Sequence, residues 1–148
     1  MVTAAGSDVV SRSPAETRAA GRELARTLSP GTLVLLSGPL GAGKTELVRG
    51  IAEGLGAGPG EVASPTFALV HEYGPAGEPP LLVHADLYRL LGPGPAAIDD
   101  LGLAEARDRG SVVVVEWPEG LGEAPDAVVV TISLEDGETR RIAVRRAS

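Results

Sequence analysis

The residues with the clearest chemical meaning form the octapeptide GPLGAGKT at positions 38–45, which matches the pattern G-x-x-x-x-G-K-[ST] at every fixed position. In such a loop, small residues let backbone N–H groups curl around a phosphate at the positive end of a helix. Lys44 can then reach the β- and γ-phosphates of a nucleotide, and the Thr45 hydroxyl can bind Mg²⁺. Lys44 is the only lysine among the 13 basic residues. The motif therefore predicts a nucleotide-phosphate site.

The segments on either side of this octapeptide are the ones that such a loop needs. Residues 32–37 form a short apolar run typical of a buried strand, and residues 46–55 carry apolar side chains at helical spacing. The order strand, glycine loop, helix aims backbone N–H groups at a phosphate. This context favours a phosphate-binding loop over a chance glycine-rich turn.

A loop of this kind also needs an acidic residue at the end of a second buried strand, to hold Mg²⁺ directly or through water. Residues 112–115 are four consecutive valines that run into Glu116, which is the pattern of a strand covered on both faces. Glu116 is therefore a candidate magnesium ligand, unless it only marks where the strand meets solvent. Trp117, which follows, either plugs the edge of the sheet or lies over the nucleotide.

Two further segments could act on the γ-phosphate. On an extended strand His84, Asp86 and Tyr88 share one face. Asp86 beside a magnesium nucleotide would be ionised and could accept a hydrogen bond from a water molecule, or it could simply cap the next segment. Thr66 could offer a hydroxyl to the γ-phosphate or to the metal. Alternatively, its Ser-Pro-Thr segment is only a rigid turn before the next strand.

Capping and periodicity signals predict the elements that position these residues. Ser13, Pro14 and Glu16 form a strong helix start, and the helix should run to about Leu28. Strands are expected at residues 8–12, 67–73, 81–87, 111–116, 127–134 and 139–145, and one or two short helices at 96–108. We therefore expect an α/β fold: a single P-loop NTPase-like domain over residues 1–148, with a central, mostly parallel sheet, helices on both faces and a C-terminal β-hairpin.

Composition excludes several other functions. The net charge of −7 gives no general positive field for nucleic acid, so any RNA contact should come from another subunit. The absence of cysteine excludes disulfides, thiolate metal sites and thiol nucleophiles. Asparagine and glutamine are also absent, so the chain has neither an Asn-Lys-x-Asp element to read guanine nor a glutamine to orient water. No apolar run or leader suggests a membrane, and we expect a cytoplasmic protein.

Four blocks along the chain point to a known family. They are residues 38–45 (GPLGAGKT), 64–67 (SPTF), 84–90 (HADLYRL) and 116–119 (EWPE). In these blocks and their order the chain resembles the TsaE (YjeE) family, bacterial P-loop ATPases needed for the threonylcarbamoyladenosine modification of tRNA. The resemblance extends from about Pro14 to Arg141. It implies that TsaD and TsaB are the partners, that tRNA is met only through their complex, and that ATP hydrolysis resets this complex between turnovers.

The resemblance also implies roles for single residues. The phosphates would be held by Gly41, Ala42, Gly43, Lys44, Thr45 and the backbone of Glu46. Mg²⁺ would be bound by Thr45 and Glu116, and the attacking water would be handled by Asp86. The adenine would lie between the first helix and the C-terminal hairpin, near Pro14, Thr17, Gly137 and Arg140. Glu46 replaces a Ser or Thr that often touches the α-phosphate, so its carboxylate must turn away or the affinity falls.

Two other functions remain open on the residues alone. A small-molecule kinase of the P-loop fold should have an arginine-rich lid, but only Arg107 and Arg109 lie between Arg89 and Arg140. A nucleotide-gated binding module would show negligible turnover. We favour a Mg²⁺-dependent ATPase that is slow when isolated, with Lys44, Asp86 and Thr66 as its catalytic candidates.

Overall fold

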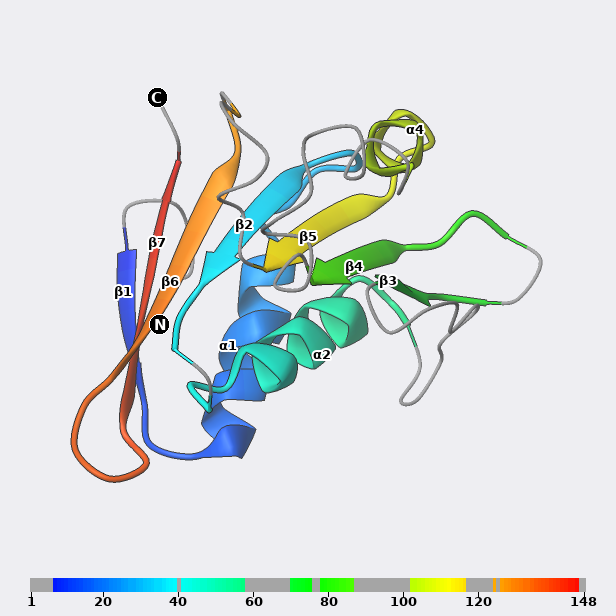
Figure 1. Cartoon of the computed structure of the whole chain (residues 1–148). Coiled ribbons are helices and arrows are strands. Elements are labelled where there is room, and N and C mark those ends of the chain that lie inside the picture. The colour runs from blue at the N-terminus through cyan, green and yellow to red at the C-terminus, as the bar shows by residue number, and fades with distance from the viewer. Residues whose placement is uncertain are drawn as a thin grey trace.

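The computed structural model of the protein describes residues 7–39, 41–57, 70–75, 78–86, 102–116, 124 and 126–146. Seven strands in this part of the chain form one sheet with the order β1-β7-β6-β2-β5-β4-β3 (Figure 1). The strands are β1 (Ser7–Ser11), β2 (Leu33–Ser37), β3 (Val70–Tyr73), β4 (Leu82–Asp86), β5 (Val112–Glu116), β6 (Val128–Leu134) and β7 (Arg140–Arg146). The four central strands β6, β2, β5 and β4 are parallel, whereas β1, β7 and β3 pair antiparallel to their neighbours. The predicted mostly parallel sheet and the C-terminal hairpin are confirmed.

The helices in the described residues lie on both faces of this sheet, as expected. The helices α1 (Pro14–Ala25) and α2 (Lys44–Gly54) lie side by side on one face, and the short α4 (Leu103–Asp108) lies on the other (Figure 1). None of these helices is both long enough and apolar enough to cross a membrane.

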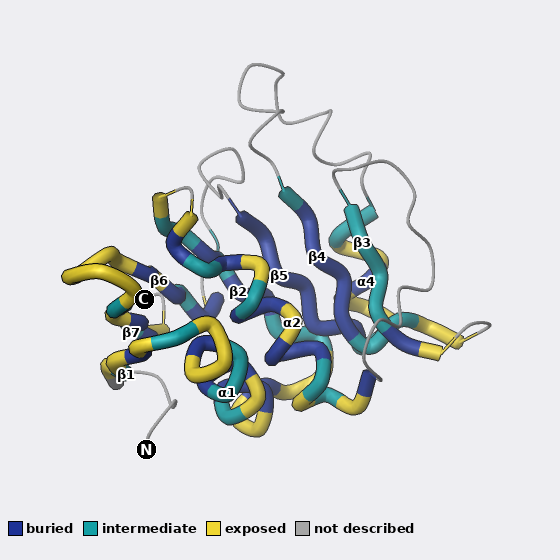
Figure 2. Tube along the Cα trace, turned by 90° about the horizontal axis from the view of Figure 1, so that it is seen from below, coloured by how far each residue is buried: buried dark blue, intermediate teal, exposed yellow. Residues whose placement is uncertain are grey.

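The alternation of side chains along the strands divides the core into two layers. In β5, Val112 and Val114 pack with the α1 and α2 side chains, whereas Val113 and Val115 pack with Ala106 of α4 on the opposite face. All five residues of β5 are buried, and Figure 2 shows the same for the middle of the sheet. Each fully buried valine contributes about 1.5–3 kcal/mol relative to an exposed one. The run of four valines is thus explained by a strand covered on both sides.

The start of α1 follows the predicted capping pattern, and its end differs. Ser13 Oγ accepts a hydrogen bond from the backbone N–H of Glu16 at 3.1 Å, and Glu16 Oε1 accepts one from the backbone N–H of Arg12 at 2.7 Å. The helix ends at Ala25 rather than near Leu28. Beyond it the backbone bonds to carbonyls three residues back, as from Leu28 N to Ala25 O at 3.1 Å, so the chain tightens into a turn before Pro30.

The packing of α1 against α2 depends on glycine. A Cβ on Gly50 would overlap the backbone carbonyl oxygen of Arg18, and a Cβ on Gly21 or Gly54 would also come too close to the facing helix. The missing side chains let the two backbones approach each other directly. This contact fixes α2, and with it the loop that precedes α2, against the start of α1.

The other predicted elements appear with small shifts at their ends. The antiparallel pairing of β3 with β4 confirms the hairpin-like connection between them, and α4 begins after Gly102, where a break was expected. The first strand begins one residue earlier than predicted. Residues 67–69 of the predicted third strand, Thr66 and Trp117 lie outside the described residues.

Candidate nucleotide-binding and catalytic site

The phosphate-binding loop connects the end of β2 to the first residue of α2. Gly41 and Gly43 have φ angles of +80° and +103°, a region that side-chain-bearing residues rarely adopt. Gly43 is the N-cap of α2, and no side chain caps the helix there. The first N–H groups of a helix have no partner within it, so those of Lys44, Thr45 and Glu46 are oriented to bind an anion.

Lys44 lies across this loop in a buried position. Its Nζ donates a hydrogen bond to the carbonyl oxygen of Gly38 at 2.6 Å and lies 3.7 Å from Oε1 of Glu116. Its side chain is only 7% exposed. The structure thus brings the predicted phosphate-binding ammonium and the predicted metal-binding carboxylate into one buried ion pair.

Glu116 reaches this place because β5 runs parallel between β2 and β4. In the strand register Glu116 is level with Leu36 of β2 and with Asp86 of β4. All three stand at the carboxyl ends of parallel strands, which is where ligands bind in open α/β sheets. By the two-residue alternation, His84, Asp86 and Glu116 project from the face that α1 and α2 cover. The two predicted carboxylates are therefore neighbours at one edge of the sheet.

A second partner of Glu116 is His84, whose Nε2 is hydrogen-bonded to Oε2. An ionised carboxylate can only accept, so the His84 N–H is the donor. Burial by itself would raise the pKa of Glu116, but the hydrogen bond and electrostatic interaction with His84 and the nearby charge of Lys44 outweigh burial and lower the pKa below its usual value. Glu116 is therefore ionised at neutral pH despite its burial.

The residues present fit a magnesium ion. Mg²⁺ is usually bound through one or two protein oxygens, substrate phosphates and waters rather than by an all-protein cage. Glu116 supplies an ionised carboxylate, and Thr45, at the start of α2, supplies an exposed hydroxyl. Among the described residues no group of three or more His, Cys, Asp or Glu side chains could hold a metal. One carboxylate and one hydroxyl suit a metal whose other ligands are waters and the phosphates of a nucleotide.

A shallow, partly open pocket lies beside the loop. Its walls come from three segments: Ser13, Pro14 and Thr17 of the α1 start, Gly41, Ala42, Gly43 and Glu46 of the loop and α2, and Glu138 and Arg140 of the hairpin. Three of the four residues predicted near the adenine therefore line it. The fourth, Gly137, is in the hairpin turn, and its carbonyl oxygen accepts a bond from Arg140 Nη1 at 2.9 Å. The Thr17 hydroxyl is hydrogen-bonded to Ser11 Oγ at 2.7 Å.

Arg140 joins the hairpin to the phosphate-binding loop. Its Nε donates to the carbonyl oxygen of Ala42 at 3.2 Å, and its Nη2 donates to that of Gly41 at 3.3 Å. A guanidinium on these carbonyls ties the loop to the hairpin. Arg140 therefore supports the loop as well as lining the pocket.

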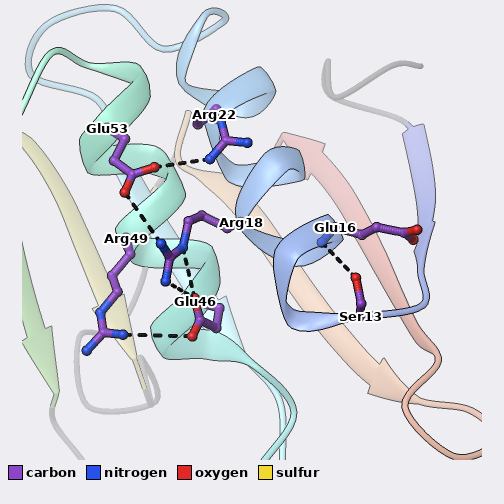
Figure 3. A network of polar contacts seen from close by, with 7 residues as sticks. All are labelled: Ser13, Glu16, Arg18, Arg22, Glu46, Arg49 and Glu53. Atoms are coloured by element: carbon purple, nitrogen blue, oxygen red, sulfur yellow. Dashed lines mark hydrogen bonds and ion pairs between the residues drawn. The ribbon is translucent and has the colours of Figure 1, made fainter. Parts of the chain in front are cut away.

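The Glu46 carboxylate turns away from the loop, one of the two outcomes expected from the sequence. Arg18 of α1 donates to Glu46 Oε1 from Nε at 3.0 Å and from Nη2 at 2.7 Å (Figure 3). The hydrogen bond and the charge of Glu46 raise the pKa of Arg18. The backbone N–H of Glu46 stays at the loop while its side chain joins the two helices.

The comparison with protein families covers almost the whole chain. The model described as "Threonylcarbamoyl adenosine biosynthesis protein TsaE" matches residues 11–143. The chain belongs to the TsaE family. The match includes the phosphate-binding loop, Glu116 and the hairpin that closes the pocket.

Individual relatives agree with the family model. The TsaE protein of Streptomyces coelicolor is 52% identical over 103 residues, which is 70% of this chain and 68% of the relative. The TsaE protein of a Synechocystis strain is 43% identical over 106 residues, or 71% of this chain and 66% of the relative. Both carry the name tRNA threonylcarbamoyladenosine biosynthesis protein TsaE. These matches span about two thirds of the length of each relative.

A solved structure shares the fold. The crystal structure of YdiB from Bacillus subtilis superposes with a TM-score of 0.70 at 31% identity, covering 95% of this chain and 84% of YdiB.

Sequence reasoning missed four residues that contribute to this site. His84, two residues before Asp86 on the same strand face, could have been found from that spacing as a partner for a neighbouring carboxylate. Ser13 was assigned only a capping role, and Glu138 lies beside the hairpin turn with no local signal. Arg18 could not be found, because its partner Glu46 is 28 positions away.

Proposed function

We propose that this chain is a Mg²⁺-dependent ATPase that acts in the threonylcarbamoyladenosine modification of tRNA. The observation that carries the proposal is the buried pair of Lys44 and Glu116, which stands beside a glycine loop at the carboxyl ends of parallel strands. An ammonium and a carboxylate so placed suit the two charges of a magnesium nucleotide: Lys44 for the phosphates, Glu116 for the metal. The names of the family and of its relatives support the pathway.

The proposed reaction is hydrolysis of the terminal phosphoryl group. A water oxygen bonds to the γ-phosphorus while the bond from phosphorus to the β,γ-bridging oxygen breaks, which gives ADP, inorganic phosphate and a proton. Asp86 orients the water, and Lys44 and the N–H groups of the loop stabilise the negative charge on the phosphates. When bound, Mg²⁺ would neutralise charge on the β- and γ-phosphates, held by Thr45 and Glu116. Thr66 remains a candidate for a further contact with the γ-phosphate.

The isolated chain should be a slow enzyme. It has no glutamine to orient the water, and we assign this task to Asp86. Phosphoryl transfer gains most of its rate from charge positioned around the γ-phosphate, and a partner can add such charge. We propose TsaB and TsaD as the partners, in the cytoplasm, with hydrolysis resetting their complex between turnovers. The net charge of −7 supports contact with tRNA only through that complex.

The test is incubation of the purified protein with ATP, with Mg²⁺ or EDTA, and with candidate small-molecule acceptors. Slow, Mg²⁺-dependent release of ADP and free phosphate is expected, and Lys44→Ala should abolish it. A phosphorylated acceptor would instead identify a kinase. Nucleotide binding without either product, also in the presence of TsaB and TsaD, would identify a nucleotide-gated binding module.

A further inference from the structure

Glu46 occupies an unfavourable place for an acidic side chain in a phosphate-binding loop. It is the third residue of α2, so its own backbone N–H is among those that a helix leaves without an internal partner. A carboxylate in the first turn is attracted to the same N–H groups that would bind a phosphate. Glu46 also lines the pocket. Unless it is restrained, this side chain would compete with a bound phosphate or repel it.

The structure supplies the restraint from the neighbouring helix. Arg18 makes two hydrogen bonds to Glu46 Oε1, and its Nη1 lies 3.8 Å from Oε2 of Glu53, about two turns further along the same face of α2 (Figure 3). Arg49 approaches the other oxygen of Glu46, with Nη1 at 3.7 Å from Oε2. Both oxygens of the carboxylate therefore face arginines. Arg18 is held in turn by the close glycine packing, because a Cβ on Gly50 would meet its backbone.

We propose that Arg18 is a positioning residue for nucleotide binding: it holds the Glu46 carboxylate away from the bound phosphates and offsets its charge. The inference rests on the proposed binding of ATP to this loop and adds a residue of α1 to the binding determinants. It explains how the chain keeps an acidic residue at the start of α2. The dependence on Arg18 should exist only while residue 46 is acidic.

The experiment measures dissociation constants of ATP, ADP and adenosine for the full chain, by titration calorimetry in the presence of Mg²⁺. Arg18→Ala should weaken the binding of ATP and of ADP about fivefold to tenfold. The effect is limited because the charges are partly exposed to solvent and Arg49 still faces Glu46. Adenosine, which has no phosphate, should bind unchanged. The loss should shrink in high salt, which screens the repulsion. In the Glu46→Thr background, the same Arg18→Ala change should have no effect.

Arg22→Ala is the matched control. Arg22 lies one turn further along α1 and pairs with Glu53, with Nη1 at 3.1 Å from Oε1, but does not contact Glu46. It should leave the ATP affinity unchanged. If Arg18→Ala is poorly folded by circular dichroism, Arg18→Met, which keeps the aliphatic length, gives the same comparison.

Two results would overturn the inference while leaving the proposed function intact. One is a wild-type ATP affinity in Arg18→Ala. The other is an equal loss for ATP and adenosine that persists in the Glu46→Thr background, which would mean that Arg18 only stabilises the helix pair. A wild-type protein that binds no nucleotide at all would overturn the proposed function, and this inference with it.

Discussion

Glu116 is an ionised carboxylate with little exposure to water, held between Lys44 and His84. Removing charge from water is unfavourable unless partners compensate, and here two partners do so, one from the start of α2 and one from β4. Such an arrangement fixes the direction of the carboxylate without a metal. At the scale of single residues, protein groups alone can thus compensate the charge of Glu116.

Glu116→Gln tests whether this carboxylate holds the metal. Gln keeps the shape of the side chain and a hydrogen bond with His84 but removes the charge. Mg²⁺-dependent hydrolysis should therefore fall roughly a hundredfold, which is the typical loss of rate when one charge-stabilising group is removed. Weak nucleotide binding in EDTA should persist. The measurement is phosphate release against Mg²⁺ concentration.

Glu105→Gln, at an exposed position of α4, is the control for this change and should behave as the wild type. A Glu116→Gln variant with unchanged Mg²⁺ dependence would place the metal carboxylate elsewhere, with Asp86 first in line.

At the scale of elements, α2 is positioned by its contact with α1. Gly50 lies where a Cβ would overlap the Arg18 carbonyl oxygen. Helix propensity alone predicts that Gly50→Ala stabilises the protein by about 1 kcal/mol. We expect the opposite sign, a destabilisation of about 1–3 kcal/mol, because the helices must move apart. The free energy of unfolding in urea decides between them, and a stabilised variant would refute the close approach.

The hairpin of β6 and β7 is the second element that shapes the loop, through Arg140. Arg140→Ala removes the hydrogen bonds to the carbonyl oxygens of Gly41 and Ala42. We expect ATP to bind about three- to tenfold more weakly, because bonds from a charged donor are lost and the loop is less ordered. Arg141→Ala is the matched control, since this side chain instead pairs with Asp8 and Glu135. Equal ATP affinities in the two variants would mean that Arg140 does not contribute to nucleotide binding.

At the scale of the whole molecule, the protein is an acidic chain whose proposed work is done in a complex. Asp86→Ala should bind ATP and the partner proteins, because Asp86 lies at the edge of the sheet and is not in the phosphate loop. Single-turnover cleavage of ATP should fall about a hundredfold, the usual contribution of a group that handles a proton or water.

Multiple-turnover threonylcarbamoylation with purified components is the decisive measurement for this variant. The first round of modification should proceed, and repeated cycles should fail if hydrolysis resets the complex. Should Asp86→Ala sustain the wild-type rate over many cycles, Asp86 has a structural role and a different residue handles the water.

The sequence by itself determined the local features of this protein. The loop at residues 38–45, the capped start of α1, the valine strand β5 and the hairpin could all be predicted, because each depends on neighbours within a few positions. The order of strands along the chain and the family resemblance then led to the α/β fold. The end of α1 was placed too late, since turn bonds near a proline compete with the last helical turn.

Only the tertiary structure decided which distant residues meet. The parallel register of β4 with β5 places Asp86 level with Glu116 and brings Glu116 within reach of His84, and no local pattern sets that register. The bond from Arg18 to Glu46 and the bonds from Arg140 to the loop join residues 28 to 99 positions apart. Such contacts depend on how the layers pack in three dimensions, and neither spacing nor periodicity in one chain records that.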